Sequence, residues 1–193
     1  VNVNLFEAIS VRKSIRQFLS EPLTEQQLER LRSFFRDLTG LFPHIEVSME
    51  ILDTSKRSQR LLAWTGVKAP YYLAFYSEQM PRSTMNVGYL MEHVNLYLTT
   101  QGIGSCFIGS MKVHKDQLTL GNKQLVCILA CGRAKGSILR KEKEAKRLPL
   151  VKLCTKKEEP KAWMLNLLNA GRLAPSSMNV HTQSPEPPDP APS

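Results

Sequence analysis

No apolar run in this 193-residue chain approaches the length of a membrane-spanning helix, and its N-terminus lacks the pattern of a signal peptide. These absences argue against a membrane-spanning protein and favour the cytoplasm. The shares of hydrophobic residues (42%) and charged residues (22%) are those of an ordinary globular protein. The length permits one domain with a substantial core.

Cysteine is scarce, with four residues at positions 106, 127, 131 and 154 and no CxxC pair. A structural zinc site needs closer ligand spacing, and disulfides are not expected in a reducing compartment. Cys127 and Cys131 fall on one face of an expected strand, a pattern typical of buried thiols that act as small hydrophobic side chains.

Acidic residues are few between Arg133 and Lys157, where ten Lys and Arg accompany two Glu. This segment therefore carries a net charge of +8, while the rest of the chain has 16 basic and 15 acidic residues. Such an excess favours an anionic partner, namely a phosphate cofactor, nucleic acid or an acidic membrane, although a solvated loop would look the same. The segment has no aromatic residue for base stacking, and no helix-turn-helix or zinc-finger spacing occurs, so nucleic acid is the weaker alternative.

The basic stretch Ser10–Phe18 places three cations and two hydroxyls within seven residues. Arg12 and Arg16 are four apart, so they share a face if the stretch is helical, and Ser14 lies between them. Two guanidiniums and a hydroxyl suit a phosphate monoester, because the guanidinium fork matches phosphate oxygens. A solvated basic helix face is the plainer interpretation of the same spacing, and both stay open on the spacing alone.

Apolar periodicity and capping signals predict the elements of the chain. Capping-box patterns begin two helices, at Asn4 with Glu7 and at Thr24 with Gln27, and Gly40 is expected to end the second. Helices are expected over 4–10, 24–40, 87–100 and about 160–173, weaker helical segments over 55–64 and 113–118, and strands over 45–51, 69–76 and 124–132. Most of the basic segment reads as loop, and residues 183–193 read as a disordered proline-rich tail.

The helix expected over 87–100 is apolar nearly all round, with Glu92 and His93 as exceptions. The segment Gly-Ile-Gly-Ser-Cys-Phe-Ile-Gly, residues 102–109, follows this helix. Glycines beside a short apolar run let the backbone approach a flat ligand, although an ordinary glycine-bounded strand reads the same way.

Three segments together resemble the FMN-dependent nitroreductase family. The first is Arg-Lys-Ser-x-Arg-x-Phe from Arg12, the second is the apolar helix with the glycine-flanked segment after it, and the third is Ala-Pro-Ser-Ser-Met-Asn from Ala174 to Asn179. The resemblance covers about the first 180 residues. It implies an α+β fold with a central mixed or antiparallel sheet flanked by helices.

The order of the motifs is similar to the branch of this family in which two nitroreductase-like halves are fused. In that arrangement residues 1–157 form the first half, 158–182 begin a second half, and 183–193 are a tail. The Gln-Pro-Trp expected after Asn179 is replaced by other residues, so we expect a truncation or frame change in the second half.

Carried over by position, the resemblance implies FMN contacts from eleven residues. Arg12, Lys13, Ser14 and Arg16 would contact the phosphate and ribityl, Ile108 and Gly109 the isoalloxazine ring, Lys146 and Arg147 the phosphate, and Ser176, Ser177 and Asn179 the flavin from the second half.

The resemblance further implies an NAD(P)H oxidoreductase that passes electrons to a nitro, quinone or similar acceptor, possible as a homodimer and impaired if truncated. No catalytic side chain, metal or GxGxxG motif is needed, since the flavin carries the chemistry. Two alternatives stay open: a flavin-binding protein without turnover, and a module that binds anions or nucleic acid through Arg133–Lys157.

Overall fold

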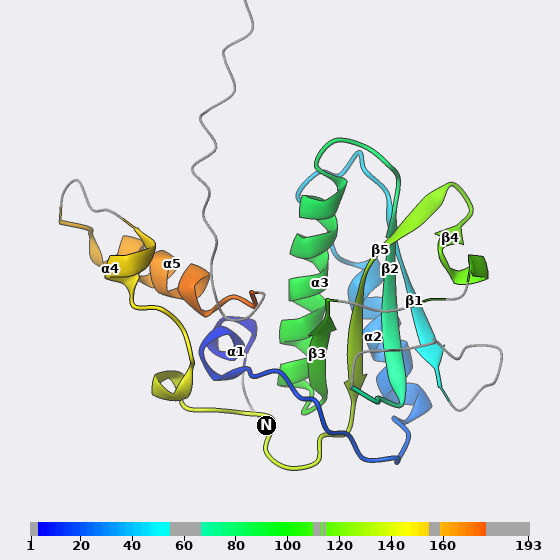
Figure 1. Cartoon of the computed structure of the whole chain (residues 1–193), viewed down its shortest axis with the longest axis horizontal. Coiled ribbons are helices and arrows are strands. Elements are labelled where there is room, and N and C mark those ends of the chain that lie inside the picture. The colour runs from blue at the N-terminus through cyan, green and yellow to red at the C-terminus, as the bar shows by residue number, and fades with distance from the viewer. Residues whose placement is uncertain (1–3, 55–66, 110–112, 114, 155–158, 177–193) are drawn as a thin grey trace, which may run out of the picture. The chain divides into compact units, whose positions relative to one another are not determined.

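The computed structural model describes residues 4–54, 67–109, 113, 115–154 and 159–176. It divides into two compact units, residues 1–143 and 144–193 (Figure 1). The helical segment expected over 55–64 and the tail from Gln183 lie outside the described residues. Among the described residues, no helix is long and apolar enough to cross a membrane.

An antiparallel sheet is the centre of the first unit, with strands in the order β1-β2-β5-β3 and β4 paired to β5. Its strands are β1 (Val47–Asp53), β2 (Tyr71–Ser77), β3 (Gly104–Ile108), β4 (Thr119–Leu120) and β5 (Lys123–Gly132). β2 is buried along its whole length, as its run of aromatic and aliphatic residues predicts. The α+β fold with a central sheet flanked by helices is therefore confirmed, and all strand pairs are antiparallel.

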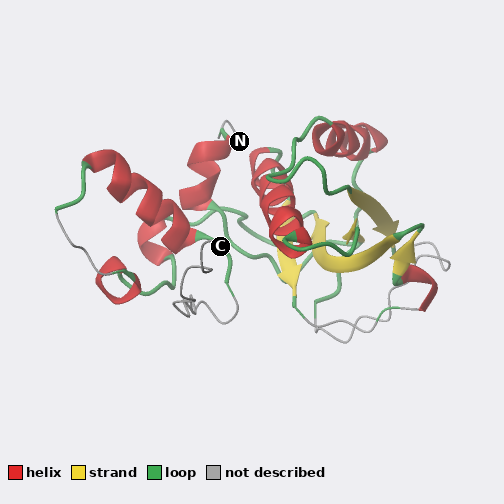
Figure 2. Cartoon of the chain, turned by 90° about the horizontal axis from the view of Figure 1, so that it is seen from above, coloured by secondary structure: helices red, strands yellow, loops and turns green. Residues whose placement is uncertain are grey.

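Two helices cover one face of this sheet, α2 (Glu25–Arg36) and α3 (Ser83–Thr100) (Figure 2). Their apolar side chains pack against alternate residues of β2 and β5, because successive side chains of a strand point to opposite faces. The main members of this cluster are Leu28, Leu31, Leu73, Phe75, Val87, Met91, Val94, Leu98, Leu129 and Cys131. Cys131 is buried and Cys127 packs against the same cluster, so the predicted shared face of these thiols is confirmed.

The other face of the sheet carries a second cluster, which includes Leu52, Tyr72, Ala74, Tyr76, Ile108 and Ile128. Tyr72 is buried there and donates a hydrogen bond of 2.8 Å from its hydroxyl to the Val67 carbonyl. Burial raises the pKa of this phenol, because the charged form would be poorly solvated.

Capping boxes begin α1 (Leu5–Val11) and α2 as the sequence predicts. The Asn4 side chain accepts from the Glu7 amide at 2.9 Å, and the Thr24 side chain accepts from the Gln27 amide at 3.2 Å. The prediction that α2 continues to Gly40 is wrong, because the helix ends at Arg36 and the chain then turns toward α3.

α3 begins four residues before the predicted start, at Ser83, after Arg82 in the left-handed conformation (φ 70°). It ends as predicted near Gly102, whose φ of 74° is readily adopted by glycine. The weak helical segment near 113–118 is a short 3₁₀ helix, η2 (Lys115–Gln117).

The second unit contains α4 (Leu150–Leu153) and α5 (Ala162–Leu173), which contact each other. A 3₁₀ turn, η3 (Glu142–Glu144), spans the boundary between the units. Most of the basic segment is loop, as predicted, but α4 is a helical turn within it. The predicted division of the chain at residue 157 concerns two fused halves and stays a prediction.

Candidate functional site

The basic stretch Arg12–Phe18 leaves the end of α1 and runs along the edge strand β3. Arg12 caps α1 with its amide on the Ala8 carbonyl at 2.9 Å, and its own ψ of 141° is extended. Ser14 then pairs in parallel with Ser105 of β3, and the Ile15 amide donates to the Ser105 carbonyl at 2.8 Å. The expectation that Arg12 and Arg16 share a helix face is wrong, because the helix ends at Val11.

On its other side the same stretch pairs with the start of the basic segment. Arg12 forms a bridge with Leu139, and Phe18 forms one with Ala134. The Lys135 amide donates to the Gln17 carbonyl at 2.9 Å. Backbone pairing therefore brings Lys135 and its neighbours beside the first basic stretch, although more than a hundred residues separate them along the chain.

Extended geometry brings Arg12, Ser14 and Arg16 together in a different way from a helix. Residues two apart point to the same side of an extended chain, so these three share a side. The Cys106 thiol lies among them: burial raises its pKa, while Arg16, a hydrogen bond with Ser14, and Arg12 each oppose that rise. Two guanidiniums and a hydroxyl therefore lie on one side of the basic stretch. We name Arg12, Ser14 and Arg16 the cationic cluster.

Ile15, on the opposite side of the stretch, is buried and seats it against β3. A Cβ added to Gly104 would lie 3.0 Å from Ile15 Cγ1 and 3.1 Å from Ala134 Cβ. The missing side chain at Gly104 therefore makes room for the basic stretch itself. A Cβ on Gly109, just after the far end of β3, would meet nothing within 4 Å, so Gly109, unlike Gly104, borders open space.

Arg12 is buried, with 2% of its surface exposed. Its Nε lies 3.7 Å from Oε1 of Glu92 on α3, and its Nη1 has no hydrogen-bond partner among the described residues. Burial lowers the pKa of the guanidinium, and the Glu92 carboxylate opposes this change. A buried nitrogen donor without a partner is costly, and an anion placed beside it would supply the missing acceptor.

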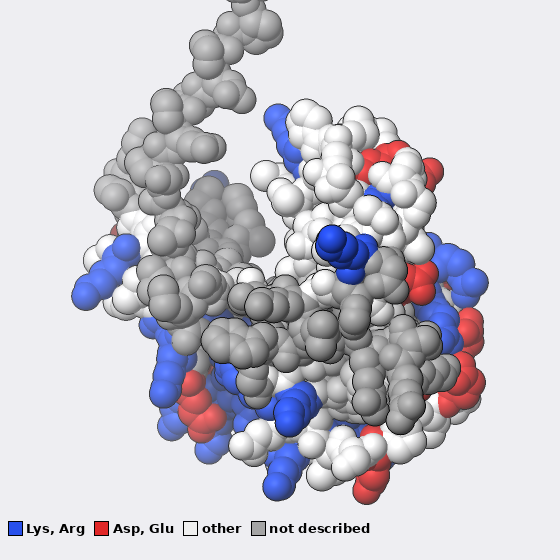
Figure 3. All heavy atoms as spheres, turned by 45° about the vertical axis from the view of Figure 1, so that its right-hand side comes forward, with Lys and Arg blue, Asp and Glu red and all other residues white. Residues whose placement is uncertain are grey.

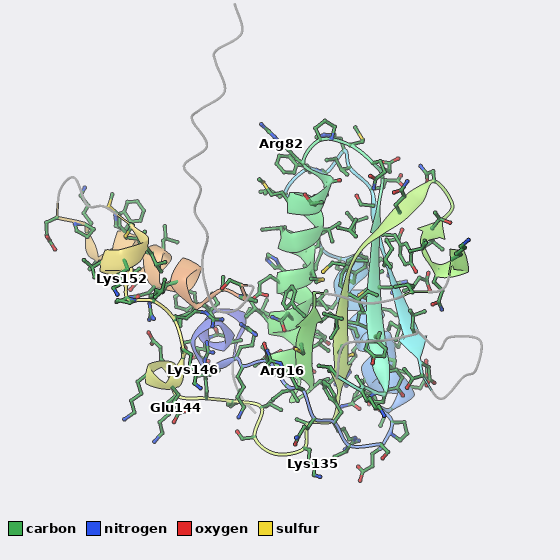
Figure 4. The ribbon with its side chains drawn as sticks, in the orientation of Figure 1. Arg16, Arg82, Lys135, Glu144, Lys146 and Lys152 are labelled. Atoms are coloured by element: carbon green, nitrogen blue, oxygen red, sulfur yellow. The ribbon has the colours of Figure 1, made fainter. Side chains whose placement is uncertain are left out.

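Arg16 is exposed, and Lys13 and Ser14 are half-buried. Figure 4 labels Arg16 close to β3, in accord with the pairing of Ser14 and Ser105. The cationic cluster therefore combines one buried cation with one exposed cation.

Ile108 and Gly109 lie at the opposite end of β3 from Gly104. Ile108 stands three positions after Ser105, about 10 Å at the rise of a strand. The Ile108 side chain is buried in the second core cluster, so a ligand at this end of β3 would contact its backbone and not its side chain. Gly109 is exposed.

The remaining predicted residues belong to the second unit or lie outside the described residues. Lys146 is exposed, and Arg147 donates from Nε to the Ala174 carbonyl at 3.3 Å, which ties two ends of this unit together. The Ser176 hydroxyl is buried without a hydrogen-bond partner among the described residues. Ser177 and Asn179 lie outside the described residues.

Three polar residues support the cationic cluster although the sequence analysis did not assign them to it: Glu92, Asn95 and Ser105. Asn95 donates from Nδ2 to Glu92 Oε2 at 2.8 Å, and the Ser105 hydroxyl donates to Asn95 Oδ1 at 2.6 Å. The available signal was the presence of Glu92 and Asn95 in the most apolar helix of the chain. Buried polar groups in such a helix need partners, and these partners lead to the basic stretch.

The family model described as "Putative TM nitroreductase" matches residues 4–183. This chain belongs to that nitroreductase family. A search of curated proteins found no match.

Solved nitroreductases share the fold. A Thermotoga maritima structure is 22% identical, with a TM-score of 0.65 over 93% of this chain and 69% of that one. A nitroreductase from Desulfovibrio desulfuricans, solved in complex with FMN, is 14% identical with a TM-score of 0.65 over 83% of this chain and all of that one. One from Desulfitobacterium hafniense, also with bound FMN, is 15% identical with a TM-score of 0.57 over 81% and 100%. At these identities the structural likeness concerns the fold alone.

Proposed function

We propose that this nitroreductase-family chain binds FMN and acts as an NAD(P)H oxidoreductase toward a nitro, quinone or similar acceptor. The observation that carries the proposal is the cationic cluster beside β3, in which the buried Arg12 Nη1 has no hydrogen-bond partner among the described residues. FMN in the structures from D. desulfuricans and D. hafniense supports the choice of cofactor. A structure from Bacteroides thetaiotaomicron described as an NADH dehydrogenase/NAD(P)H nitroreductase supports the choice of donor.

The residues present fit a flavin phosphate at one end of β3. Arg12 and Arg16 would hold phosphate oxygens with their N–H groups, and Ser14 would add a hydroxyl. Lys13 lies in the same stretch, and phosphate contacts from Lys146 and Arg147 stay predictions.

The other end of β3 would meet the ring system. About 10 Å of strand separates the pairing point of Ser14 from Ile108, a length suited to a phosphate and a ring joined by a five-carbon ribityl chain. The Ile108 backbone and the open side of Gly109 would border the isoalloxazine. Flavin contacts from Ser176, Ser177 and Asn179 stay predictions.

The protein's own contribution would be binding, orientation and electrostatics. When bound, FMN supplies the redox chemistry, exchanging a hydride equivalent with NAD(P)H and then with an acceptor. The cationic cluster would neutralise the phosphate and fix the position of the cofactor along β3. A homodimer, a cytoplasmic location and a shortened second fused half stay predictions.

The anion- or nucleic-acid-binding alternative is less well supported. The start of the segment Arg133–Lys157 is engaged in backbone pairing with residues 11–19. On the face drawn in Figure 3, Asp and Glu side chains lie among those of Lys and Arg, whereas a nucleic-acid site is typically a continuous basic surface.

The visible spectrum of the purified protein tests the proposal. Flavin absorption bands that NADH or NADPH bleaches without oxygen are the expected result. Bands that neither donor bleaches would contradict the oxidoreductase and leave a flavin-binding protein. A colourless protein that also fails to bind added FMN would overturn the proposal entirely.

A further inference from the structure

Arg12 is a cation that the fold buries before any ligand is considered. With 2% of its surface exposed, its guanidinium gains little from water, and an uncompensated charge in such a place is strongly unfavourable. The Glu92 carboxylate supplies the compensating charge, with Oε1 at 3.7 Å from Arg12 Nε. The approach is through Nε, the inner nitrogen of the guanidinium, so the outer nitrogen Nη1 is not used by this ion pair.

Glu92 is itself fixed by a chain of hydrogen bonds that ends on β3. Its second oxygen, Oε2, accepts from Asn95 Nδ2 at 2.8 Å. Asn95 is fully buried, and its Oδ1 accepts from the Ser105 hydroxyl at 2.6 Å, which requires the amide nitrogen to face Glu92. Because Ser105 also pairs with Ser14, both ends of this chain reach the basic stretch, one through a side chain and one through the backbone.

We propose that Glu92 is a positioning residue which, held by Asn95 and Ser105, orients Arg12 so that Nη1 is presented to the flavin phosphate. This inference rests on the proposed function, since it takes the FMN phosphate as the anion. Glu92 touches neither cofactor nor substrate in this account, and it acts only through Arg12. Its effect is therefore specific to flavins that carry a phosphate.

Glu92 also has an opposite, repulsive effect on phosphate binding. The negative charge of Glu92 also repels a phosphate beyond Arg12, so its removal could in principle strengthen FMN binding. Glu92 is 28% exposed, and this longer-range repulsion is screened by solvent. The pairing with Arg12 takes place in the interior, where loss of the partner leaves a buried charge, so we expect loss of Glu92 to move the guanidinium and weaken binding.

Titration of the full chain with FMN and with riboflavin, followed by flavin fluorescence, tests this role. Riboflavin lacks the phosphate but keeps the ring and ribityl. Glu92→Ala and the volume-conserving Glu92→Gln should weaken FMN binding about tenfold or more, as expected for a lost charge-assisted contact, and change riboflavin affinity less than about twofold. Glu29→Ala is the matched control, because Glu29 also pairs with arginines but lies on the exposed face of α2.

A double-mutant cycle distinguishes action through Arg12 from a general structural effect. In an Arg12→Ala background, Glu92→Ala should cause no further loss of FMN affinity. Unchanged or tighter FMN binding in both Glu92 variants would overturn the inference, as would equal weakening of FMN and riboflavin or an undiminished effect without Arg12. In each of those cases wild-type binding of FMN would leave the proposed function intact, whereas a wild-type protein that binds no FMN would overturn both.

Discussion

Ile15 Cγ1 lies 3.0 Å from the place where a Cβ on Gly104 would stand. The absence of a side chain at Gly104 therefore lets the basic stretch pack closely against β3. We expect Gly104→Val to push Ile15 away and to displace Arg12, Ser14 and Arg16 with it. Forcing extra methyl groups into a packed contact costs about 1–3 kcal/mol. Chemical denaturation should show this loss of stability, and FMN affinity should fall in the same variant.

Gly88→Ala is the control for Gly104→Val. A Cβ on Gly88 meets nothing within 4 Å, and this residue is exposed on α3. Alanine is the better helix former by about 0.5–1 kcal/mol, so this variant should be slightly more stable and should bind FMN like the wild type. Equal behaviour of the two glycine variants would contradict the seating of the basic stretch.

Arg16→Ala should weaken FMN binding without unfolding the protein. Arg16 is exposed, so its loss leaves no buried group without a partner, while its charge beside Ser14 and Cys106 is lost to the phosphate. A charge-assisted contact contributes about 1.5–3 kcal/mol, roughly a tenfold change in affinity or more. The neighbouring exposed residue provides the comparison: Gln17→Ala should leave FMN affinity unchanged, and an equal loss in both variants would argue against a specific phosphate contact.

Asn86 fixes the loop between α2 and β1 to the start of α3. It is 1% exposed, and its side chain accepts from the Phe42 amide at 2.9 Å and donates to the Phe42 and Ile45 carbonyls at 3.2 and 3.1 Å. Asn86→Ala leaves these backbone groups without partners, so we expect a loss of about 2–4 kcal/mol in urea or guanidinium unfolding.

Gln101→Ala, at the other end of α3, controls for removal of an amide. Gln101 is exposed, and its Nε2 donates a hydrogen bond to the Thr100 hydroxyl at 3.2 Å. Its removal should change stability by less than about 0.5 kcal/mol. If Asn86→Ala is equally mild, the loop is held by other contacts.

Ionisation of the Cys131 thiol should lower the free energy of unfolding at alkaline pH. Full burial raises the pKa of this thiol from 9.0 to about 12. The folded state therefore prefers the protonated thiol, and this contribution is fully present below pH 9 and is lost as the pH rises toward 12. The loss by pH 10.5 is about 2 kcal/mol.

Unfolding free energies of wild type and Cys131→Ala, measured with reductant between pH 8 and 10.5, check this prediction. Burial also raises the pKa of Tyr71, Tyr72, Tyr97 and two other thiols, so both proteins should lose stability in this range. The wild type should lose more, because it alone has the thiol at position 131. Parallel curves for the two proteins would show that this thiol does not contribute.

Local signals made most of the fold predictable. The capping boxes at Asn4 and Thr24 depend on residues three apart, and the apolar run that becomes β5 pairs with β2 and β3 within the sheet. The end of α2 was not predictable from Gly40, because the buried amide of Asn86, far along the chain, holds the loop that follows the helix.

The conformation of the basic stretch depends on partners distant in sequence. Ser14 is extended because it pairs with Ser105, and nothing between Val11 and Phe18 is a glycine or proline that would end a helix. The helical conformation expected for this stretch is wrong, yet Arg12 and Arg16 still share a side, because residues four apart lie on one side of an extended chain as well as of a helix. Glu92 could not be assigned to Arg12 without the packing of α1 against α3.

The dissociation constants of FMN and riboflavin for the wild-type chain measure directly whether the cationic cluster binds the flavin phosphate. The two ligands differ only in the phosphate, so their ratio reports what the cationic cluster contributes. We predict that FMN binds at least about tenfold tighter than riboflavin at low ionic strength, and that added salt reduces this preference. Equal affinities for the two flavins, or no binding of either, would contradict the assignment of the Arg12–Arg16 stretch to the flavin phosphate.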